Sequence, residues 1–266
     1  MSGEWTAAVY AAMYDRVVDG FAPYEGLVDS VAGLIERLHL ADGRLAPCRI
    51  LDVTCGTGSV VRRLAARGHE VVGVDPVAPL VERARRASRR FSTCSFRALD
   101  VAREDVPGTG SFDAVVSMHT LYWHPEPERV LDACRRALRP GGHAIVLTYT
   151  RPAAVFPVAR AVWRTEGIRA ALQSLRWLLP TAAFELARGG PHRYLTPGEL
   201  AGLLRERGLE PLGSCPAFLG GISQLTWSRR TAGTLARTAG PTSARLPERT
   251  QTSMRERDAA TLVVGD

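Results

Sequence analysis

The chain contains 266 residues, of which 45% are hydrophobic and 23% are charged, and it carries a formal net charge of +7 at pH 7. This composition is typical of a soluble globular protein with one large domain or two small ones. No apolar run approaches the ~18 residues that a membrane span needs, which excludes an integral membrane protein. The first residues lack a basic region followed by an apolar stretch, so we expect no secretory signal and a cytoplasmic location.

Cysteine and arginine usage narrows the chemistry further. The five cysteines are scattered and never spaced C-x-x-C, so we expect neither a disulfide framework nor a metal site. All 34 basic residues are arginine, and the absence of lysine excludes a phosphate-binding P-loop. Seven arginines and four acidic residues lie in 229–266, and many others occur as pairs on predicted helix faces without interleaved aromatic residues. We therefore expect solvated helix faces and no nucleic-acid partner.

The predicted elements begin with one or two amphipathic helices in residues 5–40. Short apolar runs then alternate with helical periodicity, which predicts strands buried on both faces of a parallel sheet. A helical segment follows at 153–190, and Thr196 and Pro197 begin another helix as N-cap and first helical residue. The predicted strands of this region are 48–53, 70–75, 94–100, 112–118 and 142–149, and the helix after the fourth strand includes Leu138 in its periodicity.

Two last extended stretches, 209–219 and 222–229, predict a hairpin because Gly220 and Gly221 separate them. The whole pattern predicts an α/β fold: a doubly wound, Rossmann-like sheet of seven mostly parallel strands with an antiparallel C-terminal hairpin. The expected segments are an N-terminal helical cap (1–47), a ligand-binding α/β core (48–152), a helical lid insertion (153–194), a C-terminal helix and hairpin completing the sheet (195–229) and a disordered tail (230–266).

The segment from Ile50 to Gly58 carries the clearest chemistry. A predicted strand ends around Asp52, and a tight turn containing Gly56 and Gly58 leads into a helix, whose N-terminus adds a positive dipole end. The next strand ends in Asp75, a carboxylate that can accept both hydroxyls of a ribose. These features predict a nucleoside-containing ligand. The third glycine of a dinucleotide fingerprint is missing, and Asp52 suits an amino group better than a pyrophosphate.

This segment resembles motif I of the class I S-adenosylmethionine (SAM)-dependent methyltransferases, usually written L-D-x-G-C-G-T-G. Further matches lie at 74–75, 98–101, 112–117 and 138–142, in the family's order and spacing. Residues 195–200 and the terminal hairpin are similar to the ubiquinone/menaquinone-type small-molecule branch. The resemblance covers most of residues 10–229.

The resemblance implies SAM as the cofactor and assigns roles to matching residues. Asp52 would lie near the methionine amino group, Asp75 would hold the ribose, and Asp100 would accept a hydrogen bond from the adenine amino group. An ordinary turn residue is the alternative for Asp100. The other implied cofactor-binding residues are Cys55, Gly56 and Gly58 around the methionine portion, Pro76 and Leu80 against the adenine, Val101 beside Asp100, Ser117 and Met118 over the sulfonium, and Tyr14 over the carboxylate end, unless Tyr14 only packs a helix onto the sheet.

Thr54 departs from the family, which usually has glycine at this position. If the position required positive φ, a β-branched residue would store about 1–3 kcal/mol of strain. We expect instead a strand-like backbone in which Thr54 crowds the methionine pocket, and this leaves a weakened affinity for SAM open.

The acceptor side is less defined. Relatives often carry one or two histidines at the positions of Tyr122 and Trp123, which His119 and His124 flank here. His119 is the candidate base, with His124 and Tyr122 behind it, and a solvated or hydrogen-bonded loop residue is the alternative for either histidine. Trp, Phe and Leu in the predicted lid indicate an apolar or aromatic acceptor, although helix core accounts for most of them.

The leading hypothesis is a SAM-dependent methyltransferase, monomer or homodimer, acting on a small, fairly hydrophobic acceptor such as a quinone-like molecule or secondary metabolite, with O-methylation ahead of C- or N-methylation. The second is a methyltransferase-fold cyclase or isomerase that uses SAM structurally or not at all. The third, a nucleic-acid methyltransferase, follows from the basic charge, but the exit of the fourth predicted strand lacks an Asn/Asp-Pro-Pro-Tyr loop suited to a flipped base. A metal-dependent O-methyltransferase is disfavoured because the chain has no asparagine for the usual ligand set.

Overall fold

The computed structural model describes residues 17–45, 47–188 and 193–232. All of them belong to the unit Met1–Ala232. The predictions for Tyr14 and for the tail beyond residue 232 therefore lie outside the described residues. Within these ranges, no helix combines the length and the apolar character that crossing a membrane requires.

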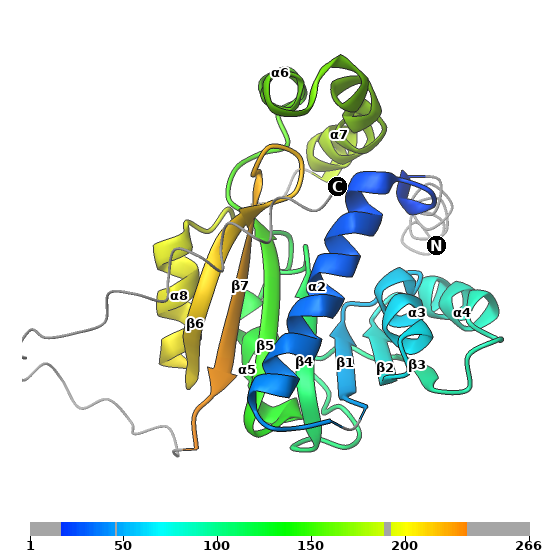
Figure 1. The fold of residues 1–266 in the computed structure, drawn as a ribbon, viewed down its shortest axis with the longest axis vertical. Coiled ribbons are helices and arrows are strands. Elements are labelled where there is room, and N and C mark those ends of the chain that lie inside the picture. The colour runs from blue at the N-terminus through cyan, green and yellow to red at the C-terminus, as the bar shows by residue number, and fades with distance from the viewer. Residues whose placement is uncertain (1–16, 46, 189–192, 233–266) are drawn as a thin grey trace, which may run out of the picture. The chain divides into compact units, whose positions relative to one another are not determined.

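Seven strands pair into one sheet: β1 (Arg49–Val53), β2 (Glu70–Asp75), β3 (Cys94–Ala98), β4 (Phe112–Met118), β5 (Leu138–Tyr149), β6 (Leu209–Ala217) and β7 (Ser223–Arg230). Their order is β3-β2-β1-β4-β5-β7-β6 (Figure 1). Strands β1 to β5 run parallel, whereas β7 pairs antiparallel with β5 and β6. The predicted doubly wound sheet with an antiparallel C-terminal hairpin is confirmed.

Helices α2 (Ala22–Ala41), α3 (Ser59–Ala66) and α4 (Ala78–Ala87) cover one face of the sheet, and α5 (Pro127–Ala137) and α8 (Pro197–Glu206) cover the other. Helices α6 (Val155–Glu166) and α7 (Ile168–Arg188) lie beyond the ends of the strands (Figure 1). Successive strand residues point to opposite faces, so neighbouring apolar residues enter different cores. Ile50 packs in the core shared with α2, α3 and α4, and Leu51 packs in the core shared with α5 and α8. Both side chains are completely buried, which explains the nearly continuous apolar character of β1.

The edge strand β3 differs from the predicted burial. In β3 only Phe96 is buried, and the other edge strand, β6, alternates between exposed and covered residues. The expectation of strands buried on both faces holds for β1 and β2 but is wrong for β3. An edge strand has a neighbour on one side only, so water reaches residues that an inner strand would bury.

The boundary between α5 and β5 also differs from the prediction. The helix ends at Ala137, and Leu138 has the extended backbone that begins β5, four residues before the predicted start. Leu138 is fully buried and pairs with Phe112 across a register irregularity in β4. Its apolar side chain suits both helical periodicity and a buried strand, and pairing with β4 decides between them.

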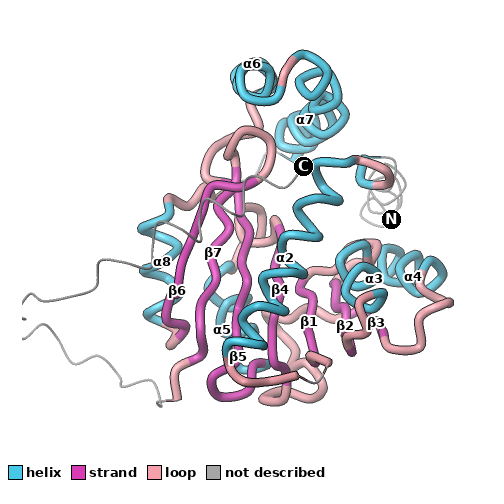
Figure 2. Tube along the Cα trace, viewed as in Figure 1, coloured by secondary structure: helices cyan, strands magenta, loops and turns pink. Residues whose placement is uncertain are grey.

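The C-terminal elements follow the prediction closely. Thr196 caps α8, and its hydroxyl accepts the Glu199 amide (3.3 Å) while the Glu199 carboxylate accepts the Thr196 amide (2.8 Å). The segment predicted as a helical lid folds into α6 and α7, and Gly167, with φ of 90°, separates the two helices. Figure 2 shows these two helices grouped beyond the ends of β5, β6 and β7.

Candidate functional site

The candidate site lies at the carboxyl edge of the parallel strands. The chain winds away in opposite directions from β1 and β4, which are neighbours in the sheet. Open α/β sheets bind ligands in the crevice outside such a switch point. Asp52, Asp75 and Met118 stand at the carboxyl ends of β1, β2 and β4, so the fold brings the predicted binding residues to one edge.

A glycine-rich turn connects β1 to α3. The Gly56 amide donates a hydrogen bond to Oδ2 of Asp75 over 2.9 Å, which links the turn to the end of β2. Gly58 caps α3 with a left-handed φ of 78°, and a Cβ added there would lie 2.8 Å from Cε1 of Phe96. Both the backbone angle and the close approach therefore require glycine at position 58.

Asp52 and Asp75 form a pair of buried carboxyl groups next to this turn, with 2% and 4% of their surfaces exposed. Burial, aided by the charge of Asp75, raises the pKa of Asp52 to about 8. Burial also raises the pKa of Asp75 to about 6, against the lowering effect of the Val77 and Gly56 amides. Oδ2 of Asp52 has no hydrogen-bond partner among the described residues. A ligand that donates amino and ribose hydroxyl hydrogens fits these two groups.

Thr54 does not adopt the strained backbone considered for it. Among the described residues other than glycine, positive φ occurs at His119, Phe218 and Leu219. The Thr54 hydroxyl lies 3.2 Å from Oγ1 of Thr120, and the Thr54 amide donates to the same oxygen over 3.4 Å. Thr54 therefore joins the end of β1 to the exit of β4. Crowding of the methionine pocket stays a prediction.

The other predicted cofactor-binding residues differ in exposure. Oδ1 of Asp100 accepts the Ala102 amide over 3.0 Å, and Oδ2 lies 3.4 Å from Nε of Arg103. This is the turn geometry expected of the alternative role, and the adenine contact stays a prediction. The hydroxyl of Ser117 is buried without a hydrogen-bond partner in the described ranges. Leu80, Val101, Cys55 and Ser117 are buried, Gly56 and Met118 are partly buried, and Pro76 is exposed.

A group of aromatic side chains lies beside this edge, contributed by the start of α2, the exit of β4, the end of β5, α7 and the β6–β7 hairpin. We call it the aromatic cluster, and its members are Phe21, Tyr24, His119, Tyr122, Tyr149, Trp177 and Phe218. The His119 ring lies 4.3 Å from that of Tyr149 and 5.7 Å from that of Phe218. Nε1 of Trp177 donates to the Tyr149 hydroxyl over 2.7 Å, which fixes these two rings relative to each other.

His119 is the polar exception within the aromatic cluster. Both ring nitrogens are buried, and neither has a hydrogen-bond partner among the described residues. Burial lowers the pKa of His119 to about 3, so the ring is neutral at physiological pH. Its backbone has φ of 55°, and its amide donates to the Leu147 carbonyl over 2.7 Å. A neutral imidazole has one donor and one acceptor, and the described residues satisfy neither.

The other two predicted catalytic residues have different surroundings. Nδ1 of His124 accepts the Glu126 amide over 3.0 Å, which is the hydrogen-bonded loop role weighed against catalysis. Tyr122 is buried with its ring edge-on to Tyr149 at 4.7 Å. The structure thus brings Tyr122 and His119 together around Tyr149.

Sequence reasoning missed several contributors to this region. Tyr149 and Phe218 carried no motif, and Trp177 stood out only as a bulky residue of a predicted helix. The link from Thr120 to Thr54 was missed as well. One signal in the sequence could have found one of these residues: Tyr149 is an aromatic residue at the end of a predicted strand. Phe218 and Trp177 had no such signal.

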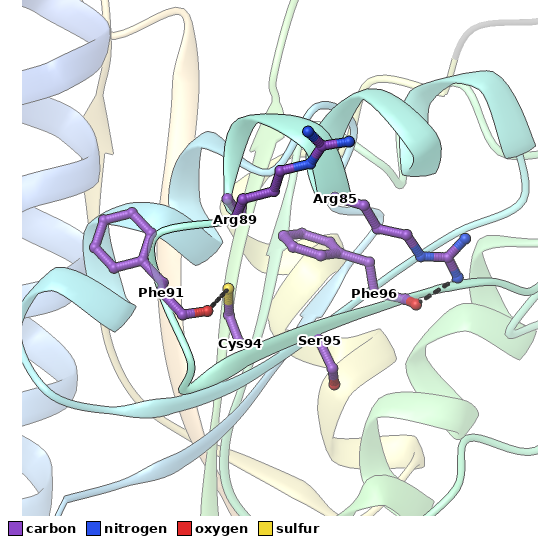
Figure 3. A pocket seen from close by; sticks show the side chains of 7 residues that line it. Arg85, Arg89, Phe91, Cys94, Ser95 and Phe96 are labelled. Carbon is purple, nitrogen blue, oxygen red and sulfur yellow. Dashed lines mark hydrogen bonds between the residues drawn. The ribbon is translucent and has the colours of Figure 1, made fainter.

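A cavity of about 300 Å³ lies at the opposite end of β3. Figure 3 shows Phe91, Cys94, Phe96 and Arg89 around it, with Nη2 of Arg85 donating to the Phe96 carbonyl over 2.7 Å. These strand residues are the first of β3, whereas its last residue, Ala98, is the one that pairs with Asp75. The cavity therefore lies away from the acidic strand ends, although Phe96 borders both the cavity and Gly58 of the turn.

Comparisons with known proteins agree with this geometry. A family model described as a methyltransferase domain matches residues 51–146. A ubiquinone biosynthesis O-methyltransferase from Xanthomonas axonopodis pv. citri (strain 306) is 34% identical over 180 residues, which cover 65% of this chain and 68% of that protein.

Solved structures resemble the fold at lower identity. Magnesium protoporphyrin IX methyltransferase (ChlM) from Synechocystis PCC 6803 aligns with a TM-score of 0.59 and 16% identity, covering 86% of this chain and 99% of that one. The [4+2]-cyclase SpnF aligns with a TM-score of 0.52 and 19% identity, covering 76% and 81%. At these identities the likeness concerns the fold alone.

Proposed function

The chain belongs to the class I SAM-dependent methyltransferases, and from this premise we propose that it methylates an oxygen atom of a small, apolar aromatic acceptor held in the aromatic cluster. The observation that carries this proposal is His119, whose two ring nitrogens are buried without partners among the described residues, surrounded by aromatic rings. The O-methyltransferase named for ubiquinone biosynthesis supports oxygen as the accepting atom.

SAM is the cofactor, and the residues at the strand ends suit it. When bound, it supplies an electrophilic methyl group on a positively charged sulfur. Asp52 would accept from the amino group, and Asp75 would accept from the ribose hydroxyls. The other residues proposed to contact it are Thr54, Cys55, Gly56 and Gly58 in the turn, Pro76 and Leu80 after β2, Asp100 and Val101 after β3, and Ser117 and Met118 at the end of β4. Tyr14 stays a candidate outside the described residues.

The aromatic cluster would hold and orient the acceptor. Aromatic walls favour a flat, apolar ring, and orientation alone can contribute roughly 7–11 kcal/mol to such a displacement. A ring nitrogen of His119 accepts a hydrogen bond from the acceptor hydroxyl, which aims the oxygen lone pair at the methyl group. SAM would supply the methyl group, and His119 would take the hydroxyl proton of the acceptor as neutral S-adenosylhomocysteine is released. The net charge of the site would be the same before and after, because the imidazolium of His119 would replace the sulfonium of SAM.

Tyr122 and His124 would have secondary roles. Tyr122 supports the ring of Tyr149 from its edge, and His124 shapes the loop through the Glu126 amide. We also propose a cytoplasmic enzyme, a placement supported by five free cysteines, four of them buried. No observation favours nucleic acid over a small acceptor, and several helix arginines have acidic partners within the chain, such as Arg63 with Asp29 over 2.6 Å.

The experiment is a chromatographic assay for S-adenosylhomocysteine with catechol and hydroquinone as acceptor probes. We expect product to form with the wild type and kcat to fall about 100-fold in His119→Phe, which keeps the aromatic volume but removes both nitrogens. His124→Ala is the comparison variant and should retain most of the rate. Because the His119 pKa lies near 3, the wild-type rate should show no limb from this group between about pH 5 and 9.

Two results would contradict the proposal. If His124→Ala lost the activity and His119→Phe kept it, His124 would be the base in place of His119. If the protein bound SAM tightly but formed no S-adenosylhomocysteine with any acceptor while converting a substrate, the cyclase hypothesis would replace it. Calorimetric binding of S-adenosylhomocysteine to each variant separates loss of chemistry from loss of folding.

A further inference from the structure

Helix α7 carries a line of exposed apolar side chains along its length. Ile168, Leu172, Leu179 and Leu186 are each between 55% and 85% exposed. With 3.6 residues per turn and 1.5 Å per residue, these four residues fall within about 40° of the helix circumference and extend over about 27 Å. We call them the α7 stripe. Soluble monomers rarely expose a continuous apolar surface of this extent unless it contacts a partner.

The α7 stripe is not needed to hold the helix on the protein. The opposite side of α7 is already buried, with Trp177 in the aromatic cluster and Ser174 and Leu178 completely covered. Leucines that served only the core would lie on that side. The α7 stripe therefore faces away from the core, because its residues lie on the side of the helix opposite the buried ones.

Helix α6 also carries exposed apolar side chains, and the two helices together carry positive charge. Phe156 and Trp163 are seven residues apart, so they share one side of α6, and they are 87% and 56% exposed. Residues 151–186 contain five arginines and two glutamates. Of these, Arg160, Arg164 and Arg169 are exposed, as is Glu166. A complementary partner must therefore be apolar and negatively charged.

We propose that the α6–α7 hairpin docks peripherally on the surface of an anionic phospholipid bilayer. The α7 stripe, Phe156 and Trp163 lie among the upper acyl chains, and the arginines contact lipid phosphates. Exposed leucine, phenylalanine and tryptophan flanked by arginine are typical of helices that lie in the plane of a membrane surface. A second copy of the chain fits less well, because it would bring one positively charged hairpin against another.

The test is co-sedimentation of the full chain with vesicles. Wild type should sediment with vesicles of phosphatidylcholine mixed with phosphatidylglycerol, and only weakly with phosphatidylcholine alone. Leu172→Ser/Leu179→Ser should weaken binding to the mixed vesicles more than about tenfold, because two large apolar side chains leave the interface. The matched control is Leu45→Ser/Leu212→Ser, which removes two exposed leucines outside α6 and α7 and should bind as wild type does. Salt should weaken wild-type binding by screening the arginines.

Three results would overturn the proposal. The first is no sedimentation of wild type with anionic vesicles, and the second is equal loss in the test and control variants. The third is a wild-type dimer that Leu172→Ser/Leu179→Ser converts to monomer without any vesicle binding, which would assign the stripe to a second copy. Binding of S-adenosylhomocysteine by calorimetry shows that each variant is folded.

Discussion

The glycine-rich turn and the aromatic cluster lie at the same edge of the sheet but are built differently. The turn is a short run of consecutive residues, and its Gly56 amide reaches Asp75, 19 positions along the chain. The aromatic cluster joins side chains as far apart as Phe21 and Phe218, whose ring centroids lie 6.4 Å from each other. The cofactor side can therefore be identified from a motif, whereas the acceptor side depends on how distant elements pack.

The two regions also differ in electrostatics. Beside the turn, two buried carboxyl groups have raised pKa values, and Oδ2 of Asp52 has no hydrogen-bond donor among the described residues. In the aromatic cluster the central polar group is a neutral imidazole. A ligand would be selected by hydrogen bonds and charge in the first region, and by shape and apolar area in the second. Variants in each region should therefore affect different ligands.

The largest effect is expected from Asp75→Ala. Loss of two charge-assisted hydrogen bonds, at about 1.5–3 kcal/mol each, should weaken S-adenosylhomocysteine binding by roughly 10²- to 10⁴-fold in calorimetry. Asp105→Ala is the control, since the Asp105 side chain is 77% exposed and pairs only with Arg136 among the described residues. An affinity within a few-fold of wild type in Asp75→Ala would remove the ribose role.

Gly58→Ala should destabilise the fold by about 2–4 kcal/mol in urea unfolding. The left-handed backbone and the clash with Phe96 both contribute. Gly26→Ala is the matched control, because Gly26 lies in α2 with nothing within 4 Å of an added Cβ, and it should stabilise by about 0.5–1 kcal/mol. Phe96→Leu added to Gly58→Ala should restore only the part due to the clash. Equal stabilities of the two alanine variants would contradict the account of the turn.

The pH dependence of stability should identify Asp52. Its folded pKa of about 8 lies above the ordinary 3.8, so its contribution is fully present below about pH 4 and is lost as pH rises through 8. The cofactor-free wild type should therefore lose about 4 kcal/mol between pH 5 and 9 relative to Asp52→Asn, because each pH unit between 5 and 8 costs about 1.4 kcal/mol. The measurement is thermal unfolding of both proteins across this range. Parallel pH profiles would show that Asp52 ionises normally.

The smallest effect is expected from Trp177→Phe, which keeps the ring packing but removes the hydrogen bond to Tyr149. A loss of about 1 kcal/mol should raise the KM for the acceptor severalfold while the affinity for S-adenosylhomocysteine stays unchanged. Trp163→Phe is the control with a soluble acceptor, because Trp163 is exposed on α6 and outside the aromatic cluster. A change in cofactor affinity instead of acceptor KM would mean that the two regions are not separate.

Errors in the predicted elements have a common cause. Leu138 was assigned to a helix because its apolar side chain completes a helical spacing, and all strands of the parallel region were expected to be buried although β3 is an edge. The local pattern of the sequence shows which residues are apolar. It does not report which strand lies beside them, and that neighbour determines both strand length and exposure.

The sequence by itself determined the order of strands and helices, the capped start of α8, and the glycine-rich turn with its acidic strand ends. These features depend on spacing, capping and backbone freedom, which act over a few residues. The tertiary structure alone decided that His119 lies among Tyr149, Trp177 and Phe218 and that its nitrogens are buried without partners in the described part of the chain. The packing of distant elements at the edge of the sheet brings those residues together, and no interaction between near neighbours in the chain specifies this arrangement.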